Sequence, residues 1–413
     1  MQAVIMCAGK STRTAPLTLT RPKALLPILN RPLIEHQIEA LAPLVDQITL
    51  VVGYLQEAIR AHCGDEMAGV RIRYVEQREQ RGTGHAVLQC REIIEGDFLC
   101  LNGDDLYDPA DLARLASTPQ GALAKEVPDP RLYGIYAVDS DGNATRLEEK
   151  PSNPFSNLAN VGAYHLPMEV FDLLSATAPS PRGEIEITSG VQALAESSPF
   201  RVVTMQGYWL PIGYPWHLLD ANGWFLRHRL AAGNHGTVHP HATVDGAVHI
   251  GRGTNLHAGV VIEGPAYIGD ECEIGPNCVI RGGSVIGDGC RIGPGVEVDR
   301  SVLFEGTAAA HLTYIGDSVI GAGVDFGGGT VTANLRHDGA TVRSMIQGAL
   351  VDTNRMTFGA VLGDGVRTGI NTSILPGRKL WPRTATLPGA VVKSDVMLGA
   401  AAQDQAETKE EPK

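Results

Sequence analysis

Residues 250–293 read IGRGTNLHAGVVIEGPAYIGDECEIGPNCVIRGGSVIGDGCRIG. Within this stretch the pair Ile-Gly recurs from 250 to 268 to 286 and from 274 to 292, so that each series advances by three hexapeptides. One hexapeptide supplies a short strand and a turn, so three hexapeptides make one triangular coil with an apolar residue pointing inward. We expect glycine to relieve backbone strain at the corners. The Ile-Gly pairs stand at 250–251, 268–269, 274–275, 286–287, 292–293, 315–316 and 320–321.

Two irregularities interrupt this period. The register of the pairs breaks between residues 293 and 315, and an insertion-like segment runs from about 335 to 357. Irregularity in a solenoid usually marks a loop that leaves the coil, and loops often carry function. We therefore expect functional residues near both places.

The glycine content also locates the domain boundary. Residues 236–400 hold 30 of the 48 glycines, and the other 248 positions hold only 18. We expect a first domain over residues 1–232, a β-helix over 236–400 and a disordered polar tail over 401–413.

The first domain alternates apolar runs with helical patterns. This alternation implies an α/β domain with a mostly parallel sheet and helices on both faces. Ligands in such sheets bind beyond the carboxyl ends of the strands. Strands are predicted at Ala3–Cys7, Ile48–Val52, Ile72–Val75, Phe98–Leu101, Gly121–Ala124 and Val161–His165, and helices at Pro32–Leu44, Leu55–His62, Gly84–Ile94 and Pro215–Leu230.

The composition excludes several classes of protein. Of the 413 residues, 43% are hydrophobic and 19% are charged, which is typical of a folded chain. The net charge of -12 argues against a nucleic-acid partner, although local Lys and Arg can still bind anionic substrates.

Seven scattered cysteines without a CxxC pair indicate reduced thiols in a cytoplasmic protein. We expect neither a signal peptide nor a membrane span, because no basic region precedes the short apolar N-terminus and no apolar run is long enough to cross a bilayer.

A glycine loop follows the first predicted strand. It reads AGKSTRTAPLT over residues 8–18, and Gly9-Lys10-Ser11 suggests a P-loop. That motif needs a glycine at position 4, where valine stands, and Pro16 disfavours a helix starting at Lys10. We therefore exclude the P-loop.

The same loop, followed by Pro22-Lys23, resembles the opening of the sugar-1-phosphate nucleotidyltransferases, a family with a Rossmann-like domain. The resemblance implies that the loop backbone, at Ala8, Gly9 and Ser11, binds the nucleotide. It also implies that Arg13 and Lys23 hold the phosphates as catalytic residues. The chemistry agrees, because joining two anions depends mostly on positioning and charge neutralisation.

Further segments match this family in order and spacing. The Gln…Gly-Thr segment, with Gln77, Gly82 and Thr83, resembles the part that reads a pyrimidine base. Asp104, at the end of an apolar strand, matches the family's Mg²⁺ ligand, and a carboxylate suits that hard cation. Alone, a Gly-Asp pair there would be an ordinary turn. The sugar and its phosphate would be bound at the positions that match the family's sugar-side motifs, namely Gly134, Glu149, Lys150 and Asn160.

Three departures from the family pattern stand out. Ser11 occupies the place of the second glycine in the loop, and Ser189 stands where an Asp is usual. Pro211 occupies the position of a second metal-binding Asp. Water, Asp105 or another acid takes over that role, or else the nucleotidyl transfer is weak.

Two segments of the repeat region resemble the acetyltransferase site of the bifunctional UDP-N-acetylglucosamine pyrophosphorylase/glucosamine-1-phosphate N-acetyltransferases, in the archaeal form. They are residues 311–317, HLTYIGD, and 327–339, GGGTVTANLRHDG. The resemblance implies that His311 is the general base and that Tyr314 and Asn334 orient the sugar phosphate and the acetyl group, with Arg343 binding the phosphate. Histidine suits this work because its pKa lies near working pH. The alternative is that His311 and Tyr314 only cap an irregular coil.

The resemblance further implies a left-handed β-helix that assembles as a homotrimer, with acetyl-CoA bound between the coils of neighbouring subunits. Three functions remain open. The first is a bifunctional enzyme that acetylates glucosamine-1-phosphate from acetyl-CoA and couples the product to UTP, giving UDP-N-acetylglucosamine and pyrophosphate. The second is a nucleotidyltransferase for glucose-1-phosphate with dTTP or UTP, whose β-helix is structural. The third is a non-catalytic regulatory subunit, which only Pro211 suggests. Intact motifs in both halves favour the first.

Overall fold

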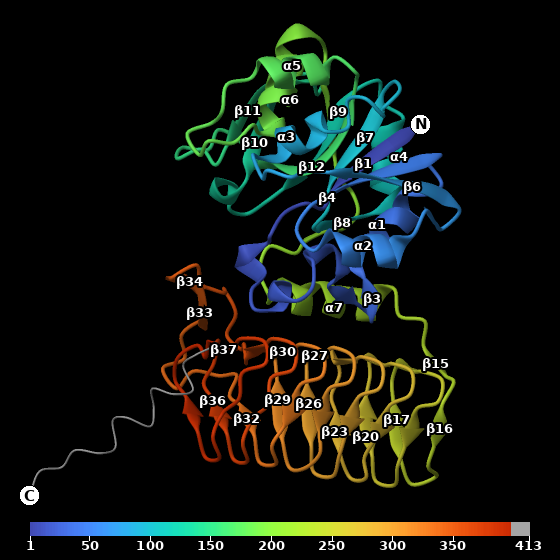
Figure 1. Ribbon diagram of the computed structural model, residues 1–413, viewed down its shortest axis with the longest axis vertical. Helices are drawn as coiled ribbons and strands as arrows, with labels where there is room; N and C mark the ends of the chain where they lie inside the picture. The colour runs from blue at the N-terminus through green and yellow to red at the C-terminus, as the bar shows by residue number, and fades with distance from the viewer. Residues whose placement is uncertain (398–413) are drawn as a thin grey trace, which may run out of the picture. The chain divides into compact units, whose positions relative to one another are not determined.

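A computed structural model describes residues 1–397 of the chain (Figure 1). The contacts between residues divide it into two compact units. The first comprises Met1–Lys10, Pro22–Leu25 and Pro32–Pro211, and the second comprises Ser11–Arg21, Leu26–Arg31 and the chain from Ile212 onward. The tail expected over 401–413 lies outside the described residues. Within the described part of the chain, no helix combines the length and apolarity needed to cross a membrane.

The first unit is built on a mixed sheet with a parallel centre. The parallel strands run in the order β6 (Val70–Glu76), β4 (Gln47–Val52), β1 (Gln2–Met6) and β7 (Phe98–Asn102). Every residue of β4 is buried, because helices cover both faces of the sheet. The carboxyl ends of β1 and β7 therefore meet at one edge, where the glycine loop and Asp104 begin.

The rest of the sheet is mainly antiparallel, which the alternation of strands and helices did not predict. Here β12 (Leu158–Leu166) pairs antiparallel with β7, β9 and β10. The other strands of this unit are β9 (Gly121–Glu126), β10 (Gly134–Val138), β11 (Ala144–Glu149), β13 (Arg201–Thr204), β5 (Glu66–Met67), and the separate pair β8 (Asp105–Tyr107) and β14 (Trp209–Pro211).

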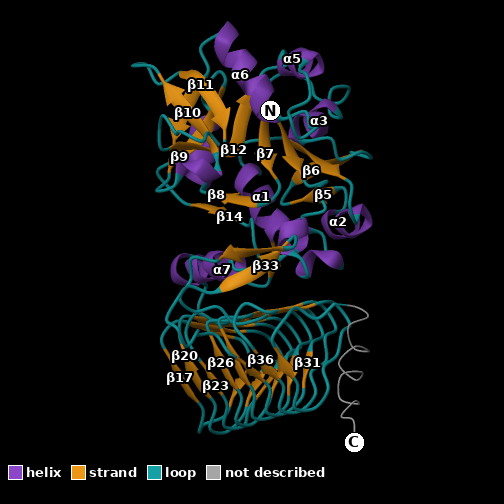
Figure 2. Cartoon of the chain, turned by 90° about the vertical axis from the view of Figure 1, so that its left-hand side faces the viewer, coloured by secondary structure: helices purple, strands orange, loops and turns teal. Residues whose placement is uncertain are grey.

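Helices cover both faces of this sheet (Figure 2). Buried side chains of α1, α2 and α4 pack with one face, and those of α3, α5 and α6 pack with the other, which gives two hydrophobic cores. The first group is α1 (Leu33–Leu41), α2 (Gln56–Cys63) and α4 (Pro109–Ala116); the second is α3 (Thr83–Leu88), α5 (Val170–Ala176) and α6 (Ile187–Ser197). The helices are short, and α3 ends at Leu88, well before the predicted end at Ile94.

The second unit contains a left-handed parallel β-helix with three sheets. One consists of β15 (Gly233–Asn234), β18 (Val248–Ile250), β21 (Ala266–Ile268), β24 (Val285–Ile286), β27 (Val302–Leu303), β30 (Val319–Ile320), β35 (Val361–Leu362) and β37 (Lys379–Leu380). The next consists of β16 (Thr237–Val238), β19 (Asn255–Leu256), β22 (Glu273–Ile274), β25 (Arg291–Ile292), β28 (Ala308–Ala309) and β31 (Asp325–Phe326). The third consists of β17 (Thr243–Asp245), β20 (Val261–Glu263), β23 (Val279–Ile280), β26 (Glu297–Asp299), β29 (Tyr314–Gly316), β32 (Val331–Thr332), β36 (Ser373–Ile374) and β38 (Val391–Val392).

The isoleucines of the Ile-Gly pairs form the core of these coils. Ile250, Ile268 and Ile286 are direct partners in successive strands and are almost fully buried. The glycine that follows each of them is needed for a different reason from the one predicted. A Cβ atom on Gly251 would lie 2.4 Å from the backbone of Gly269 in the next coil, so close approach excludes a side chain. Backbone strain applies instead at other turn positions, such as Gly253 with φ +69°.

The register break predicted between 293 and 315 is a change of coil length. Ile268 pairs with Ile286, which is a step of three full hexapeptides. Ile286 in turn pairs with Leu303, and Leu303 with Ile320, so each of these coils is shorter by one residue. The three sheets continue through the shorter coils. No loop leaves the coil within this part of the described chain.

The second irregularity is an insertion, as predicted. β30 pairs with β35, so that the partner of Ile320 is Leu362, more than two coil lengths later in the chain. Part of the extra chain forms the hairpin β33 (Arg343–Ile346) and β34 (Ala349–Asp352). A bridge between Leu335 and Thr357 closes its base.

Two segments from the N-terminal part of the sequence pack within the second unit. Thr20 Oγ1 donates to Asp364 Oδ2 at 2.8 Å, and Gln347 Nε2 donates to Thr12 Oγ1 at 2.6 Å. Leu29 N donates to Asn222 Oδ1 at 2.7 Å, which ties the second segment to α7. The remaining elements are α7 (His217–His228), the pair β2 (Pro27–Ile28) and β3 (Arg31–Pro32), and the 3-10 turns η1 (Thr12–Thr14), η2 (Leu17–Leu19), η3 (Lys23–Leu25) and η4 (Pro130–Leu132).

Lys379 supports this packing from inside the unit. Its side chain is almost fully buried, and its Nζ donates to the carbonyl oxygen of Ala15 at 3.1 Å. Burial lowers the pKa of Lys379 to about 8, with opposing effects of the charges on Asp395 and Arg378. Between pH 8 and the ordinary lysine pKa, the unfolded chain therefore holds a proton that the folded chain has released.

We expect the stability of the second unit to depend on Lys379 and pH. Between pH 7 and pH 10.5 the folded wild type loses the buried charge of Lys379, which should add roughly 3 kcal/mol to its free energy of unfolding. The Lys379→Met variant has no such charge to lose. Its free energy of unfolding should therefore fall behind that of wild type by this amount over the same interval. Urea unfolding at both pH values measures the difference. Lys393→Met, at an exposed lysine of the same end of the β-helix, should give no such change. Equal behaviour of the two variants would show that Lys379 titrates like a surface lysine.

Candidate functional site

The loop after β1 is fixed through the carbonyl oxygen of Ala8. This oxygen accepts hydrogen bonds from Tyr54 N at 3.2 Å and Gln80 Nε2 at 2.9 Å. Gly9 beside it is exposed, and a Cβ atom there would meet nothing within 4 Å. The loop backbone at Ala8 and Gly9 is thus held from one side and open on the other, which suits a backbone contact with a ligand.

Ser11 keeps the backbone conformation that a glycine would take. Its φ is 51°, in the left-handed region, and its carbonyl oxygen accepts bonds from Thr14 Oγ1 at 2.8 Å and Thr18 Oγ1 at 2.9 Å. Ser11 therefore adopts the left-handed backbone conformation that a glycine at this position would favour. Only the short turn η1 follows, as expected from the exclusion of the P-loop. Arg13 lies on this turn, exposed, with its guanidinium 5.5 Å from the centre of the Tyr214 ring.

Lys23 and Asp104, which are distant in sequence, form an ion pair. Lys23 is buried and Asp104 is partly exposed, so the carboxylate is the accessible half of the pair. Oxygen ligands from one or two carboxylates, completed by substrate phosphates and water, are what Mg²⁺ takes in such sites. Asp104 therefore fits the expected metal ligand.

Asp105 follows and has a different environment. It is buried, and its Oδ2 accepts from Asn102 Nδ2 at 3.2 Å and from the Tyr107 hydroxyl at 3.3 Å. Burial, and then the charge of Asp104, raises the pKa of Asp105 to about 8. Pro211 on β14 is its partner across the β8–β14 pair. The proline thus stands opposite a carboxylate that the sequence already suggested as a replacement.

The segment predicted to read the base is held against the start of α6. Gln77 is buried and its Nε2 donates to the carbonyl oxygen of Gly82 at 3.0 Å. Gly82 has φ +104°, and a Cβ atom there would lie 2.4 Å from the carbonyl oxygen of Ile185, so only glycine fits. The Thr83 hydroxyl accepts a bond from Ile187 N at 3.0 Å.

The predicted sugar residues lie on the antiparallel side of the sheet. Gly134 and Glu149 are partners on β10 and β11, and a Cβ atom on Gly134 would approach Glu149 Oε2 to 3.0 Å. Glu149 and Lys150 line a cavity of about 690 Å³, together with Arg182 and Glu186, which are paired at 2.9 Å. Asn160 lies on β12, where its Nδ2 donates to the Tyr164 hydroxyl at 2.7 Å.

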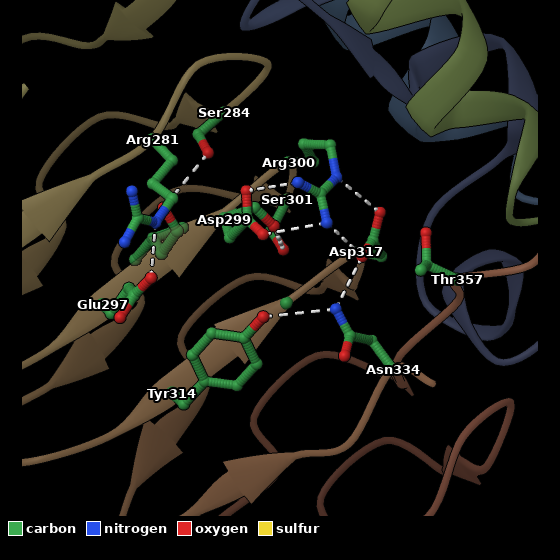
Figure 3. Close-up of polar contacts among 12 residues, drawn as sticks. Arg281, Ser284, Glu297, Asp299, Arg300, Ser301, Tyr314, Asp317, Asn334 and Thr357 are labelled. Atoms are coloured by element: carbon green, nitrogen blue, oxygen red, sulfur yellow. Dashed lines mark hydrogen bonds and ion pairs between the residues drawn. The ribbon is translucent and has the colours of Figure 1, made fainter. Parts of the chain in front are cut away.

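A second group of polar side chains lies in the β-helix (Figure 3). Asn334 Nδ2 donates to the Tyr314 hydroxyl at 3.2 Å and to Asp317 Oδ2 at 2.7 Å. The amide oxygen of Asn334 points away from both partners in Figure 3. Burial raises the pKa of Tyr314, so its hydroxyl keeps its proton. The structure thus brings together Tyr314 and Asn334, to which the resemblance assigns one site.

The sequence analysis missed Arg300 and Asp299 and gave no role to Asp317. Arg300 donates to Asp317 through Nε at 3.0 Å and Nη2 at 2.9 Å, and to Asp299 Oδ1 through Nη1 at 2.9 Å. Burial raises the pKa of Asp299. Arg300, Asp317 and Asn334 are evenly spaced by the length of one short coil, so they stand one above another. The even spacing of these polar residues was the available signal.

His311 and Arg343 are not hydrogen-bonded to this network in the part of the chain that the structure describes. His311 is exposed, and its carbonyl oxygen accepts from Thr313 Oγ1 at 2.8 Å and Gly329 N at 3.4 Å. Arg343 begins the hairpin strand β33, and its carbonyl oxygen accepts from Arg378 Nη2 at 2.9 Å. In the described part of the chain, no hydrogen bond joins the side chain of either residue to Tyr314 or Asn334.

Comparison with known proteins places the chain in one family. The family model for nucleotidyl transferases matches residues 2–227, and the model of the GMPPB C-terminal domain matches residues 262–384. The bifunctional protein GlmU of Methanococcus maripaludis is 40% identical over 398 residues, which is 96% of this chain and 95% of that protein. The chain belongs to this family.

A second relative agrees with this assignment, and a solved structure shares the fold. The bifunctional sugar-1-phosphate nucleotidylyltransferase/acetyltransferase of Sulfurisphaera tokodaii is 37% identical over 408 residues, covering 97% of this chain and 99% of that protein. The crystal structure of a UDP-glucose pyrophosphorylase complexed with UDP-glucose superimposes with a TM-score of 0.52 at 24% identity, covering 55% of this chain and 99% of that one. This last likeness concerns the fold alone. The chain is thus a transferase with a nucleotidyltransferase domain and an acetyltransferase β-helix.

Proposed function

We propose that this chain makes UDP-N-acetylglucosamine in two steps, first acetylating glucosamine-1-phosphate and then joining the product to UTP. The observation that carries the proposal is that one chain, similar to bifunctional relatives over 96% of its length, contains polar groups suited to each reaction. The Lys23–Asp104 pair supports the nucleotidyl step, and the Tyr314–Asn334 pair supports the acetyl step.

In the acetyl step, the amino nitrogen of glucosamine-1-phosphate attacks the thioester carbonyl of acetyl-CoA. A C–N bond forms, the C–S bond breaks, and the coenzyme A thiolate leaves. His311 takes the proton that the nitrogen loses and returns a proton to the thiolate. Tyr314 and Asn334 hold the sugar phosphate and the acetyl group in the reacting geometry, while Arg343 binds the phosphate.

In the nucleotidyl step, a phosphate oxygen of N-acetylglucosamine-1-phosphate attacks the α-phosphorus of UTP. The bond to the bridging oxygen breaks and pyrophosphate leaves. Mg²⁺, which Asp104 would hold, supplies charge neutralisation when bound. Lys23 and Arg13 balance the phosphate charge, Gln77 with the Gly82-Thr83 turn holds the base, and the sugar contacts Gly134, Glu149, Lys150 and Asn160.

Mass spectrometry of the products tests both steps together. Purified protein is incubated with Mg²⁺, acetyl-CoA, glucosamine-1-phosphate and a mixture of UTP, dTTP, CTP and GTP. A peak of UDP-N-acetylglucosamine is the expected result. N-acetylglucosamine-1-phosphate alone would mean that the nucleotidyl site is inactive with this sugar, as the proline at 211 could cause. A nucleotide sugar without acetylation, formed when glucose-1-phosphate is supplied, would support a monofunctional enzyme, and no product at all would support a regulatory subunit.

The β-helix also has features of a subunit interface, and the proposal includes a homotrimer in the cytoplasm. Apolar side chains are exposed in the turns that precede strands of one sheet: Leu312 before β29 is 72% exposed, Ile370 before β36 is 57% exposed and Leu387 before β38 is 55% exposed. Apolar patches rimmed by polar residues commonly bind other proteins. Acetyl-CoA would bind between neighbouring coils of two subunits.

The seven cysteines, all within the described residues, are free and buried, as suits a reducing compartment.

Charge placed at Leu312 should weaken this assembly. We expect Leu312→Glu to shift the protein from trimer toward monomer, because a carboxylate would have to be buried at the subunit contact. Sedimentation velocity measures the change, and the acetyl-transfer rate should fall with the trimer fraction. Leu132→Glu, at a leucine of the first unit that is 58% exposed, is the matched control and should leave the trimer intact. An unchanged trimer in Leu312→Glu would place the interface elsewhere.

A further inference from the structure

Asp317 is a buried carboxylate in the middle of the β-helix polar network. Its side chain is 1% exposed. Its backbone has φ 44°, its N donates to the Asp299 carbonyl oxygen at 2.9 Å, and its own carbonyl oxygen accepts from Gly359 N at 2.9 Å. Both neighbouring coils therefore fix the position from which this side chain extends.

The Asp317 carboxylate holds two other side chains in place. Arg300 contacts both of its oxygens, in the two-point geometry that makes guanidinium pairs strong. Asn334 Nδ2 shares the Oδ2 atom at 2.7 Å. An isolated buried carboxylate would be costly, and these donors compensate for that cost.

The consequence for Asn334 is a defined amide orientation. Its Nδ2 has two hydrogens, and Asp317 and the Tyr314 hydroxyl accept them, so the amide cannot rotate by half a turn without losing both bonds. The amide oxygen is thereby directed away from Asp317, as Figure 3 shows. A neutral amide at position 317 could instead donate to Asn334 and stabilise the reversed orientation.

We propose that Asp317 is a positioning residue for acetyl transfer, which acts by fixing the orientation of the Asn334 amide and, through it, the Tyr314 hydroxyl. This inference rests on the proposed acetyl step at Tyr314 and Asn334. The carboxylate itself is almost fully buried, so we assign it no direct contact with a reactant. Its role is to keep the Asn334 oxygen available to the sugar phosphate and acetyl group.

The variant Asp317→Asn tests this role in the full-length enzyme. The kcat of acetyl transfer should fall about 10²-fold, as expected when a reacting group is held in the wrong geometry. Uridylyl transfer by the same preparation, started from N-acetylglucosamine-1-phosphate, should stay unchanged. Asp270→Asn is the matched control, because Asp270 caps a turn of an earlier coil, with its Oδ1 accepting from Arg252 N at 2.8 Å, and it should leave both activities unchanged.

A double-mutant cycle separates positioning from general support of the fold. If Asp317 acts through Asn334, the double variant Asp317→Asn/Asn334→Ala should lose no more acetyl transfer than Asn334→Ala alone. Multiplied losses would overturn the inference, as would an acetyl-transfer kcat of Asp317→Asn equal to wild type.

Two remaining outcomes are also informative. If Asp317→Asn fails to fold, Asn334→Ala is the deciding variant, because Asn334 is only half-buried and its replacement should not prevent folding. Full acetyl transfer in Asn334→Ala would overturn the inference. Loss of acetyl transfer with normal uridylyl transfer would support it. A wild-type enzyme that acetylates no amino-sugar phosphate would instead refute the proposed acetyl step. The wild-type assay therefore distinguishes failure of the function from failure of the positioning role.

Discussion

Replacing His311 with alanine is expected to lower the rate of acetyl transfer by about 10²–10⁴-fold, the usual effect of losing a general base. The imidazole would take the proton of the attacking amino group. His311 is exposed and its backbone is held by Thr313 and Gly329, so removal of the ring leaves the coil intact. Release of the coenzyme A thiol measures acetyl transfer, and release of pyrophosphate measures uridylyl transfer in the same sample.

The comparison with a second histidine makes this result specific. His241→Ala removes another exposed imidazole of the β-helix, near its first coil, and should leave both rates unchanged. Uridylyl transfer should also be normal in His311→Ala. If wild type is active and His311→Ala acetylates at the same rate, the base is another group. If neither wild type nor His311→Ala acetylates, the β-helix has a structural role.

The β-helix illustrates what a repeat pattern can predict. The pairs Ile250-Gly251 and Ile268-Gly269 predicted a coil of three hexapeptides, and the strand partners confirm it. The pattern could not predict the shorter coils, because their inward positions carry Leu303 and Ala309 in place of Ile before Gly. An inward position requires only a small or medium apolar side chain, so the motif can disappear while the fold continues.

The missed network residues follow from the same cause. Arg300, Asp317 and Asn334 come together only in the shorter coils, because a coil of three full hexapeptides would place each of them one position out of line. In the first unit, Lys23 and Asp104 were found singly from the family motifs, and the fold supplies their contact. The antiparallel strand β11 was not predicted, because only Ala144 of its residues is buried and the strand lacks an apolar run.

Replacing Lys23 with methionine is expected to lower the kcat of uridylyl transfer by about 10²–10³-fold, the usual loss when one preorganised electrostatic contact to the reacting group is removed. Lys23 is buried and paired with Asp104, and Asp105 follows directly in the chain. Without the ammonium group, the Asp104 carboxylate loses the cation that offsets its charge, and the phosphates of both substrates meet a more negative site. Pyrophosphate release with saturating UTP measures the effect.

The control for Lys23→Met is a basic residue that also forms an ion pair with an aspartate, but on the surface and away from the site. Arg91 forms an ion pair of 2.5 Å with Asp172 on the surface of the first unit, and Arg91→Met should keep the wild-type rate. Acetyl transfer should be normal in both variants, because its residues lie in the β-helix. A buried charge that loses its partner also destabilises a fold, so the melting temperature of Lys23→Met is measured alongside. A variant that is folded, acetylates normally and retains full uridylyl transfer would remove Lys23 from the phosphate site.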